Sequence, residues 1–522
     1  MIGILYPQPA RRAGVLVLAA LVRSVGRAQA IPLSRGALSS VPIVVGVDVP
    51  DAWADDLIAW LTLGGAGRKL ILFGRVPTQL AAHLGWTLGE LPATLAQDCR
   101  SAPAPSRAWG ASAAFVQYGD TAGALGGATW KRPFERFDFT NEWNNLGYGA
   151  IRCDDSPWSL AVALEAGSSE VAAVHTEAGR VTSYAALLER RGASIFWINR
   201  AIGSSDSFEW RLVENFIASH RPDELFCQPV LREVPWGYDA AVTSRLDCDE
   251  DVESARPLWN MYRELGVPFS LAVHTRNLQD PRQHVILQEL QAQGEAVLSH
   301  TASHAPNWGG SYEAALAEGR ESATLLREVT GAAVRYAVSP FHQTPPYALE
   351  GLADAGYLGC VGGIICNDPE FVLARGGTLA GMPDGFVGHS QQCMLHGECM
   401  LEDGDPLAIF KQAFDQAYAG SSLFGYLDHP FSARYAYGWS DEQVRCDAHR
   451  ALIAHIRERS RRPIFMNENV AMDFLLMKSR ATVTATGQGF AVRMPAPAEN
   501  PSELTLAVDF KGEVFPAEPG GI

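Results

Sequence analysis

The stretch AVLSHTASH, residues 296–304, joins a short apolar run to two histidines that lie four positions apart. Earlier in the chain, the stretch RLDCDE at residues 245–250 carries Asp247 and Asp249 on either side of Cys248. Two imidazoles and one carboxylate can bind a single metal ion, and a second carboxylate can then accept a proton from a water molecule. The two stretches together predict a metal site beside a base, which is typical of a hydrolase.

The spacing of His300 and His304 predicts that both side chains face the same way. Residues four apart on a helical turn share one face, and both rings can then reach a cation at about 2.0–2.1 Å. An HxxxH pattern also occurs by chance in helix caps and at surfaces, so the pair alone fixes only two ligands. Asp249 is the predicted third ligand and Asp247 the predicted base. A solvated or calcium-binding acidic loop is the alternative, because more acidic residues follow directly.

The length and charge of the chain limit the possible functions. At 522 residues the chain is too long for one ordinary hydrophobic core, so we expect two or three domains. Lysine and arginine number 42 against 58 acidic residues, a formal charge of -16, and no basic run stands out. We therefore expect no nucleic-acid partner and a neutral or cationic substrate. The cysteines show no CxxC spacing, although Cys393 and Cys399 could pair.

Residues 1–30 allow two interpretations. The apolar run 13–22 follows two arginines and precedes the small-residue pattern AQA, as in a signal peptide. Arg23 and Arg27 interrupt the part that should be neutral, and the run is too short to cross a membrane, so we expect no transmembrane segment. A buried strand and a helix are the favoured interpretation. We therefore expect a cytoplasmic location, with a periplasmic or secreted one as the alternative if this segment is cleaved.

Residues 1–235 show the alternation of an α/β domain. Continuous apolar runs of the kind found in buried parallel strands are followed by segments with helical spacing. The predicted strands are Ile2–Tyr6, Pro42–Val49, Lys69–Phe73 and Ser194–Ile198, and the predicted helices are Ala10–Val25, Asp51–Leu63, Thr78–His83 and Phe208–Ala218. This pattern predicts a doubly wound domain, similar in outline to glutamine-amidotransferase-like or flavodoxin-like domains.

Residues 1–235 contain no recognisable catalytic motif. Cys99 and Cys153 lack the flanking glycines of a nucleophile elbow. Glycines 64, 65 and 67 lack the lysine of a phosphate loop and the spacing of a dinucleotide-binding loop. We expect this domain to be a scaffold or a contact surface for a protein partner.

Residues 236–478 form the second predicted domain, in which polar clusters follow strands. The predicted strands are Ala240–Leu246, Val267–Val273 and Ala296–Leu298. Asp247 and His300 therefore lie just beyond strand ends, the edge at which parallel barrels and open α/β sheets build their active sites.

The order of motifs from Trp236 to Lys478 resembles the polysaccharide deacetylase family, also called the NodB-homology domain or carbohydrate esterase family four. The pieces that carry the resemblance are LDCDED (246–251), GVPFSLAV (266–273), LQELQAQGEAVLSHTASH (287–304), REVTGAAVRYAVSPF (327–341), LEGLADAGY (349–357) and YLDHP (426–430). The resemblance implies a distorted (β/α) barrel and a metal-dependent hydrolase that removes acyl groups from N-acetylated sugars.

The resemblance also implies a role for each polar residue of the motifs. Asp247 resembles the general base, and Asp249, His300 and His304 resemble the metal ligands. His429 resembles the general acid that protonates the leaving amine. One divalent ion, with zinc as the expected metal, is the implied cofactor, and an N-acetylated saccharide is the implied substrate. The physical logic agrees, because a cation polarises the amide carbonyl and a poor amine leaving group needs a proton.

Three positions depart from the family pattern. The two aspartates are separated by one residue, whereas the commonest pattern has them adjacent, so Asp251 is a competing ligand. The arginine that normally orients the base is missing from VSPF (338–341), and Arg245 or Arg335 is the candidate replacement. The aspartate that tunes the general acid is assigned to Asp384. Altered or absent activity is therefore the alternative.

Aromatic residues near the predicted site could bind a sugar ring. We predict substrate contacts for Trp308, Phe341, Tyr435 and Trp439, and Tyr437 lies in the same segment. Core packing is the alternative for each ring. Further histidines are expected at the rim of the site, namely His274, His342, His389 and His396.

Residues 479–522 alternate polar and apolar positions between glycines and prolines, which predicts a small β-module. The predicted strands are Ala481–Thr486, Phe490–Arg493 and Leu504–Phe510. We expect this module to pack against the rest of the chain, with carbohydrate contact as the alternative. For the whole chain, the first hypothesis is an N-deacetylase acting on an amino-sugar polymer or oligosaccharide. The alternatives are a hydrolase of a small non-peptide amide and a non-catalytic carbohydrate-binding or assembly protein.

Overall fold

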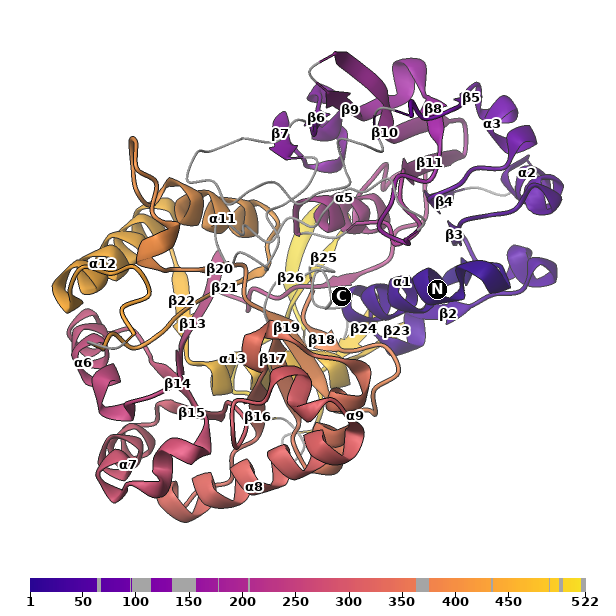
Figure 1. Ribbon diagram of the computed structural model, residues 1–522. Helices are drawn as coiled ribbons and strands as arrows, with labels where there is room; N and C mark the ends of the chain where they lie inside the picture. The colour runs from indigo at the N-terminus through magenta and orange to yellow at the C-terminus, as the bar shows by residue number, and fades with distance from the viewer. Residues whose placement is uncertain are drawn as a thin grey trace.

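The computed structural model describes residues 1–62, 67–93, 95, 114–133, 156–176, 178–204, 207–362, 375–432, 435–487, 489–496 and 501–517. A sheet built from the N-terminal part of the chain and a ring of strands built from its second half form two separate layers of structure (Figure 1). Cys99, Cys153 and glycines 64 and 65 lie outside the described residues.

The N-terminal sheet is parallel in one half and antiparallel in the other. Its hydrogen-bonded order is β2-β1-β3-β4-β11-β10-β9-β6-β7. The parallel strands are β1 Ile2–Leu5, β2 Ala30–Pro32, β3 Ile43–Val47, β4 Arg68–Phe73 and β11 Ala193–Ile198. The antiparallel strands are β6 Ala114–Tyr118, β7 Trp130–Pro133, β9 Glu170–Thr176 and β10 Gly179–Arg190. The four predicted strands all belong to the parallel half, and the antiparallel half is an addition to the predicted doubly wound pattern.

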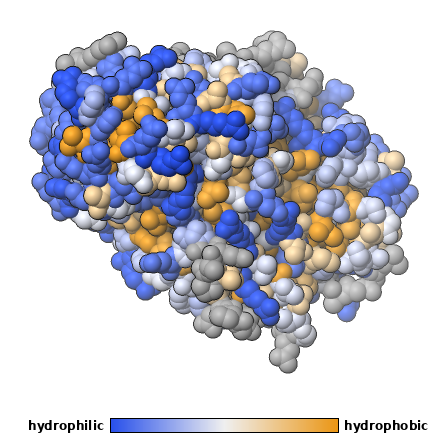
Figure 2. All heavy atoms as spheres, turned by 90° about the horizontal axis from the view of Figure 1, so that it is seen from below, coloured by the Kyte–Doolittle hydropathy of each residue, from blue (hydrophilic) through white to orange (hydrophobic). Residues whose placement is uncertain are grey.

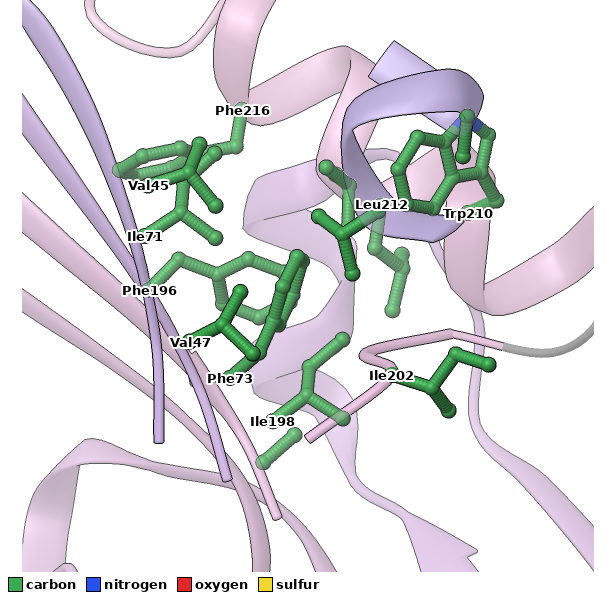
Figure 3. Packing of buried hydrophobic residues seen from close by; sticks show 14 of the residues in the cluster. Val45, Val47, Ile71, Phe73, Phe196, Ile198, Ile202, Trp210, Leu212 and Phe216 are labelled. Carbon is green, nitrogen blue, oxygen red and sulfur yellow. The ribbon is translucent and has the colours of Figure 1, made fainter. Parts of the chain in front are cut away.

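Helices cover both faces of the parallel half, which explains why its strands are apolar throughout. Side chains alternate between the faces, so that Val45 and Ile71 pack on one side and Val44 and Leu70 on the other. Figure 3 shows Val45, Ile71 and Phe196 directed at Phe216. The helices are α1 Arg11–Val25 and α5 Ser207–Ala218 on this face, and α2 Ala54–Thr62 and α3 Thr78–Leu84 on the other.

The second sheet closes into a ring of parallel strands. The chain runs from β19 through Gln391 and Gln392 into β20, and this segment pairs with β17 at its start and with β21 at its end. The Gln392 N–H donates to the Gly425 carbonyl at 2.8 Å, which completes the ring. The strands are β13 Ala240–Cys248, β14 Ser270–Val273, β15 Ala296–Ser299, β16 Tyr336–Val338, β17 Gly359–Gly362, β19 Val387–Ser390, β20 Cys393–Met394 and β21 Leu423–Asp428.

Helices surround this ring on its outer side (Figure 1). They are α6 Arg256–Leu265, α7 His284–Ala292, α8 Tyr312–Thr330, α9 Pro346–Asp354, α11 Ala408–Ala419 and α12 Glu442–Arg459. A further helix, α13 Glu468–Arg480, instead packs against side chains on the inner side of the ring, such as Ala241 and Val338. Several begin at a residue whose side chain accepts a backbone N–H, as Ser311 does for α8 and Asp441 for α12. The result is an α/β domain of the kind that the family resemblance implied.

The C-terminal strands form two separate hairpins. β23 Thr482–Ala485 pairs with β24 Phe490–Arg493, and β25 Ala507–Phe510 pairs with β26 Glu513–Pro516. β25 also pairs with β12 Val230–Leu231, which lies in the link between the two large domains. The predicted strands are therefore present, but they do not make one sheet of their own.

Buried charges join the N-terminal domain to the ring. Glu214 on α5 forms an ion pair with Arg375 at 2.7 Å, and both side chains are 2% exposed. Arg23 on α1 donates to the Thr378 carbonyl at 3.1 Å. Because breaking a buried ion pair leaves an uncompensated charge, these contacts hold the two domains in one arrangement.

The face of the molecule in Figure 2 is largely hydrophilic, and its hydrophobic side chains lie in several separate groups. Among the described helices, none combines the length and the apolar composition needed to cross a membrane.

Candidate functional site

The ends of β13, β15 and β21 bring the predicted site residues together. Asp247 lies in β13, and Asp249 follows its last residue. Because side chains alternate along a strand, Asp247 and Asp249 face the same side, while Cys248 points away into the core beside α6. His300 follows β15 and His429 follows β21. The one-residue spacing between the aspartates is thus what places both carboxylates at the site.

Asp249, His300 and His304 form a compact group of metal-ligating atoms. The Asp249 Oδ1 atom lies 3.7 Å from His300 Nε2 and 3.2 Å from His304 Nε2, and the two Nε2 atoms are 3.1 Å apart. Ligands at about 2.0–2.1 Å around a tetrahedral zinc ion stand roughly 3.3 Å from one another. The spacing of these three atoms fits that geometry.

Two further observations support a cation at this point. His300 Nδ1 lies 3.2 Å from the Val338 carbonyl, which can only accept, so Nδ1 carries the proton and Nε2 turns its lone pair toward the group. Asp249 Oδ1 is a buried acceptor with no hydrogen-bond partner among the described residues. An uncompensated acceptor of this kind is costly unless it binds something, so the residues fit a divalent metal ion.

The loop that carries the two histidines is not the helical turn that the spacing predicted. Residues 301–305 are irregular, and Thr301 and His304 have left-handed φ values of 69° and 55°. The carboxylate of Glu318 on α8 holds the loop, accepting the N–H groups of Ala302 and Ser303, each at 2.9 Å. The loop that brings the two histidines together is therefore strained, and Glu318 on α8 holds it in place. No sequence motif signals Glu318.

Arg245 replaces the arginine that is missing from residues 338–341. Its Nε and a terminal nitrogen donate to the two oxygens of Asp247 at 2.6 and 3.1 Å. Burial opposes ionisation of Asp247, but the charge of Arg245 outweighs it and holds the pKa of Asp247 below its usual value. Arg335, the other candidate, instead pairs with Asp473. Asp247, the predicted base, is thus oriented by a residue of its own strand.

His429 faces the metal-ligating group from β21. Its Nε2 lies 3.8 Å from Asp249 Oδ2, and its Nδ1 lies 2.7 Å from His396 Nε2. Asp384, the aspartate predicted to tune it, is 69% exposed and pairs with Arg27, so that assignment is wrong. His396 is fully buried beside His429, whereas the sequence placed it at the rim.

Tyr437, which the sequence suggested only as a possible platform for a sugar ring, contacts the metal-ligating group and His429 directly. Its hydroxyl donates to Asp249 Oδ2 at 2.8 Å, and its ring stacks on His429 with centroids 4.1 Å apart. Burial raises the pKa of Asp249 to about 6, against the hydrogen bond from Tyr437. Asp251, the competing ligand, instead accepts the N–H of Glu253 at the start of a helical turn.

The predicted substrate-binding rings divide into exposed and buried pairs. Phe341 is 44% exposed, and the centroid of its ring lies 4.5 Å from that of His304. Tyr435 is 42% exposed. Trp308 is fully buried and Trp439 is 4% exposed, so the prediction that they bind sugar is wrong. Their indole N–H groups are used inside the protein, where that of Trp308 donates to the Gln343 carbonyl. Buried rings offer no face to a ligand.

A small, open pocket lies beside Asp249. Its lining combines acidic, hydroxyl and aromatic side chains and consists of Cys248, Asp249, Glu250, Asp251, Ser254, Pro430, Ser432, Tyr435 and Tyr437. The pocket therefore presents negative charge and hydrogen-bonding groups next to the metal-ligating atoms.

Comparison with known proteins finds a polysaccharide deacetylase family model that matches residues 247–359. No curated protein matches the chain. Similar solved structures include one described as a polysaccharide deacetylase from Mycobacterium smegmatis, with 13% identity, 46% of this chain and 93% of that chain covered, and a TM-score of 0.35.

Two other solved structures are similar to a comparable extent. The chitin deacetylase of Colletotrichum lindemuthianum shares 15% identity over 46% of this chain and 89% of its own, with a TM-score of 0.31. A family-four pseudoenzyme from Bacillus anthracis shares 11% identity over 45% of this chain and 66% of its own, with a TM-score of 0.30. Likenesses this weak assign neither activity nor substrate. The segment that matches the polysaccharide deacetylase family model, residues 247–359, carries Asp247, the metal-ligating group and the loop that holds the two histidines.

Proposed function

We propose that this protein is a metal-dependent hydrolase that removes N-acetyl groups from an amino-sugar polymer or oligosaccharide. The observation that carries the proposal is the meeting of five side chains at one end of the ring, supplied by three strand ends. They are the base Asp247, the metal-ligating group Asp249, His300 and His304, and the acid His429.

Each residue of the site has a separate role in this reaction. Arg245 keeps Asp247 ionised and oriented, so that the carboxylate can accept a proton from the attacking water. His429, directed at the metal-ligating group, supplies a proton to the leaving nitrogen. A divalent ion, zinc in our proposal, would polarise the amide carbonyl and acidify water when held by the three ligands. Tyr437 fixes the position of Asp249 through a hydrogen bond and that of the His429 ring through stacking.

The surroundings of the site favour an amino sugar as substrate. The pocket beside Asp249 is acidic and the chain carries a formal charge of -16, which suits a neutral or cationic molecule rather than an anionic one. Phe341 and Tyr435 expose aromatic rings on which a sugar can stack.

Acetate release from N-acetylglucosamine oligomers, with zinc added to the purified protein, tests the proposal. We expect turnover in the wild type and a loss of at least about 100-fold in Asp247→Asn, since general-base catalysis contributes about that much or more. Asp354→Asn is the matched control, because this carboxylate, at the end of α9, accepts the exposed hydroxyl of Tyr312 on α8. Absence of acetate with every divalent ion, or full activity of Asp247→Asn, would contradict the proposal.

A further inference from the structure

His396 makes a short contact to the ring of His429. It lies just after β20 and is fully buried, and its Nε2 is 2.7 Å from His429 Nδ1. The sequence placed His396 with the spare histidines, and the proposed reaction above does not use it. A polar pair this close and this buried must share a proton, so the position of that proton decides what His429 can do.

A metal ion does not explain the pair. The ligand atoms of His396, Asp428 and His429 do lie close enough together to suggest one. However, 2.7 Å is shorter than the roughly 3.3 Å that separates two ligands of a tetrahedral zinc ion. Asp428 is also engaged already, by His449 Nε2 at 3.0 Å and by the Arg445 guanidinium at 3.6 Å, which repels a second cation. The contact between the two imidazoles is therefore a hydrogen bond.

Asp428 decides the direction of this hydrogen bond. Its Oδ1 lies 3.8 Å from His396 Nε2, and a carboxylate favours an N–H over a lone pair at that distance. The proton therefore belongs to His396 Nε2, which donates, and His429 Nδ1 accepts. Asp428 is itself fixed, because it is fully buried between His449 and Arg445.

The tautomer of His429 follows from this direction. A neutral imidazole that accepts at Nδ1 carries its own proton on Nε2, the atom that lies 3.8 Å from Asp249 Oδ2. The opposite direction would place the proton of His429 on Nδ1, pointing away from the site, and would leave only a lone pair at Nε2.

We propose that His396 is the positioning residue of His429: it donates its Nε2 proton to Nδ1 and thereby holds the His429 proton at Nε2, facing the metal-ligating group. His396 touches no substrate in this scheme and acts only through His429. The catalytic consequence rests on the proposed function: with one extra proton on the pair, held on His396 beside the Asp428 carboxylate, His429 gives its Nε2 proton to the leaving nitrogen while the Nε2 proton of His396 passes to His429 Nδ1, which leaves both rings neutral. The tautomer itself does not rest on it.

Nitrogen-15 NMR of ring-labelled histidine tests the tautomer without substrate or turnover. We expect the His429 signals, identified by their loss in His429→Asn, to show a protonated Nε2 and an unprotonated Nδ1. In His396→Leu, which removes the donor, we expect the two tautomers to mix. In His396→Gln, whose amide can still donate, we expect more of the Nε2–H form than in the leucine variant. A wild-type signal with the proton on Nδ1 would overturn the proposal.

Kinetics supply the second readout. We expect His396→Leu to lower kcat by about tenfold or more with little change in KM, because substrate binding is untouched while proton delivery suffers. His396→Gln should lose less. His455→Gln is the control, since this histidine bonds Asp415 on the outer surface. An equal loss of kcat in the leucine and glutamine variants would count against a donor role.

The outcomes also separate the two proposals. A wild type with the expected tautomer but no acetate release would leave His396 as the positioning residue and refute the proposed function. Acetate release with the opposite tautomer would support the proposed function and refute the role of His396. If His396→Leu does not fold, the wild-type spectrum alone decides.

Discussion

Replacing Arg245 by methionine isolates the ion pair that stands in for the missing family arginine. The Arg245 side chain is fully buried and that of Asp247 is 3% exposed, so the substitution leaves a buried carboxylate without its partner. Removing one member of such a pair costs about 3–5 kcal/mol of unfolding free energy. Methionine has a similar length and no charge, so little of this cost arises from lost packing.

Arg335→Met is the matched control for this experiment. Arg335 makes a comparable two-point contact with Asp473, but its side chain is 39% exposed, so water can replace the contact and the cost is about 1 kcal/mol or less. Urea unfolding followed by tryptophan fluorescence measures both variants. In Arg245→Met/Asp247→Asn, where neither charge remains, we expect at least about 2 kcal/mol to be regained relative to the sum of the single variants. Equal costs for Arg245→Met and Arg335→Met, or simple additivity, would refute the reasoning.

Other predictions concern the loop at residues 301–305, which carries His304, and Glu468 at the start of α13. Glu318→Ala should weaken zinc binding by about 10- to 100-fold in a calorimetric titration, because the histidine loop loses the carboxylate that accepts its N–H groups. Glu321→Ala on the same helix is the control. Equal zinc affinities of the two variants would contradict this role of Glu318. Burial raises the pKa of Glu468 to about 7 from an unfolded value of about 4.5, so its contribution to stability is present below pH 4.5 and lost as the pH rises through 7. Glu468→Gln should therefore gain stability over the wild type by about 2 to 3 kcal/mol between pH 5 and pH 8, and a gap independent of pH would contradict this.

The sequence predicted those parts of the site that depend on strand alternation and strand ends. Asp247 and Asp249 share a face because strands have a period of two, and His300 and His429 lie near them because parallel strands end at one edge. These relations are local or follow from the sheet, so a pattern of residues carries them.

The parts that the sequence could not supply depend on contacts between distant segments. Glu318 and His396 act across loops whose paths are set by packing, and His304 adopts a left-handed conformation that no spacing rule anticipates. Trp308 resembled an exposed platform, yet it fills the core, because a large apolar ring gains most free energy there.

Metal content tests the central claim most directly. We expect the purified wild type, dialysed against zinc, to hold one zinc ion per chain by elemental analysis. His300→Ala should hold none. The variant loses the ring that the Val338 carbonyl orients and whose Nε2 lies beside the ligand atoms of Asp249 and His304. His284→Ala, which removes a histidine that bonds the Leu278 carbonyl, should bind as the wild type does. A wild type without metal, or equal zinc in His300→Ala, would contradict the account.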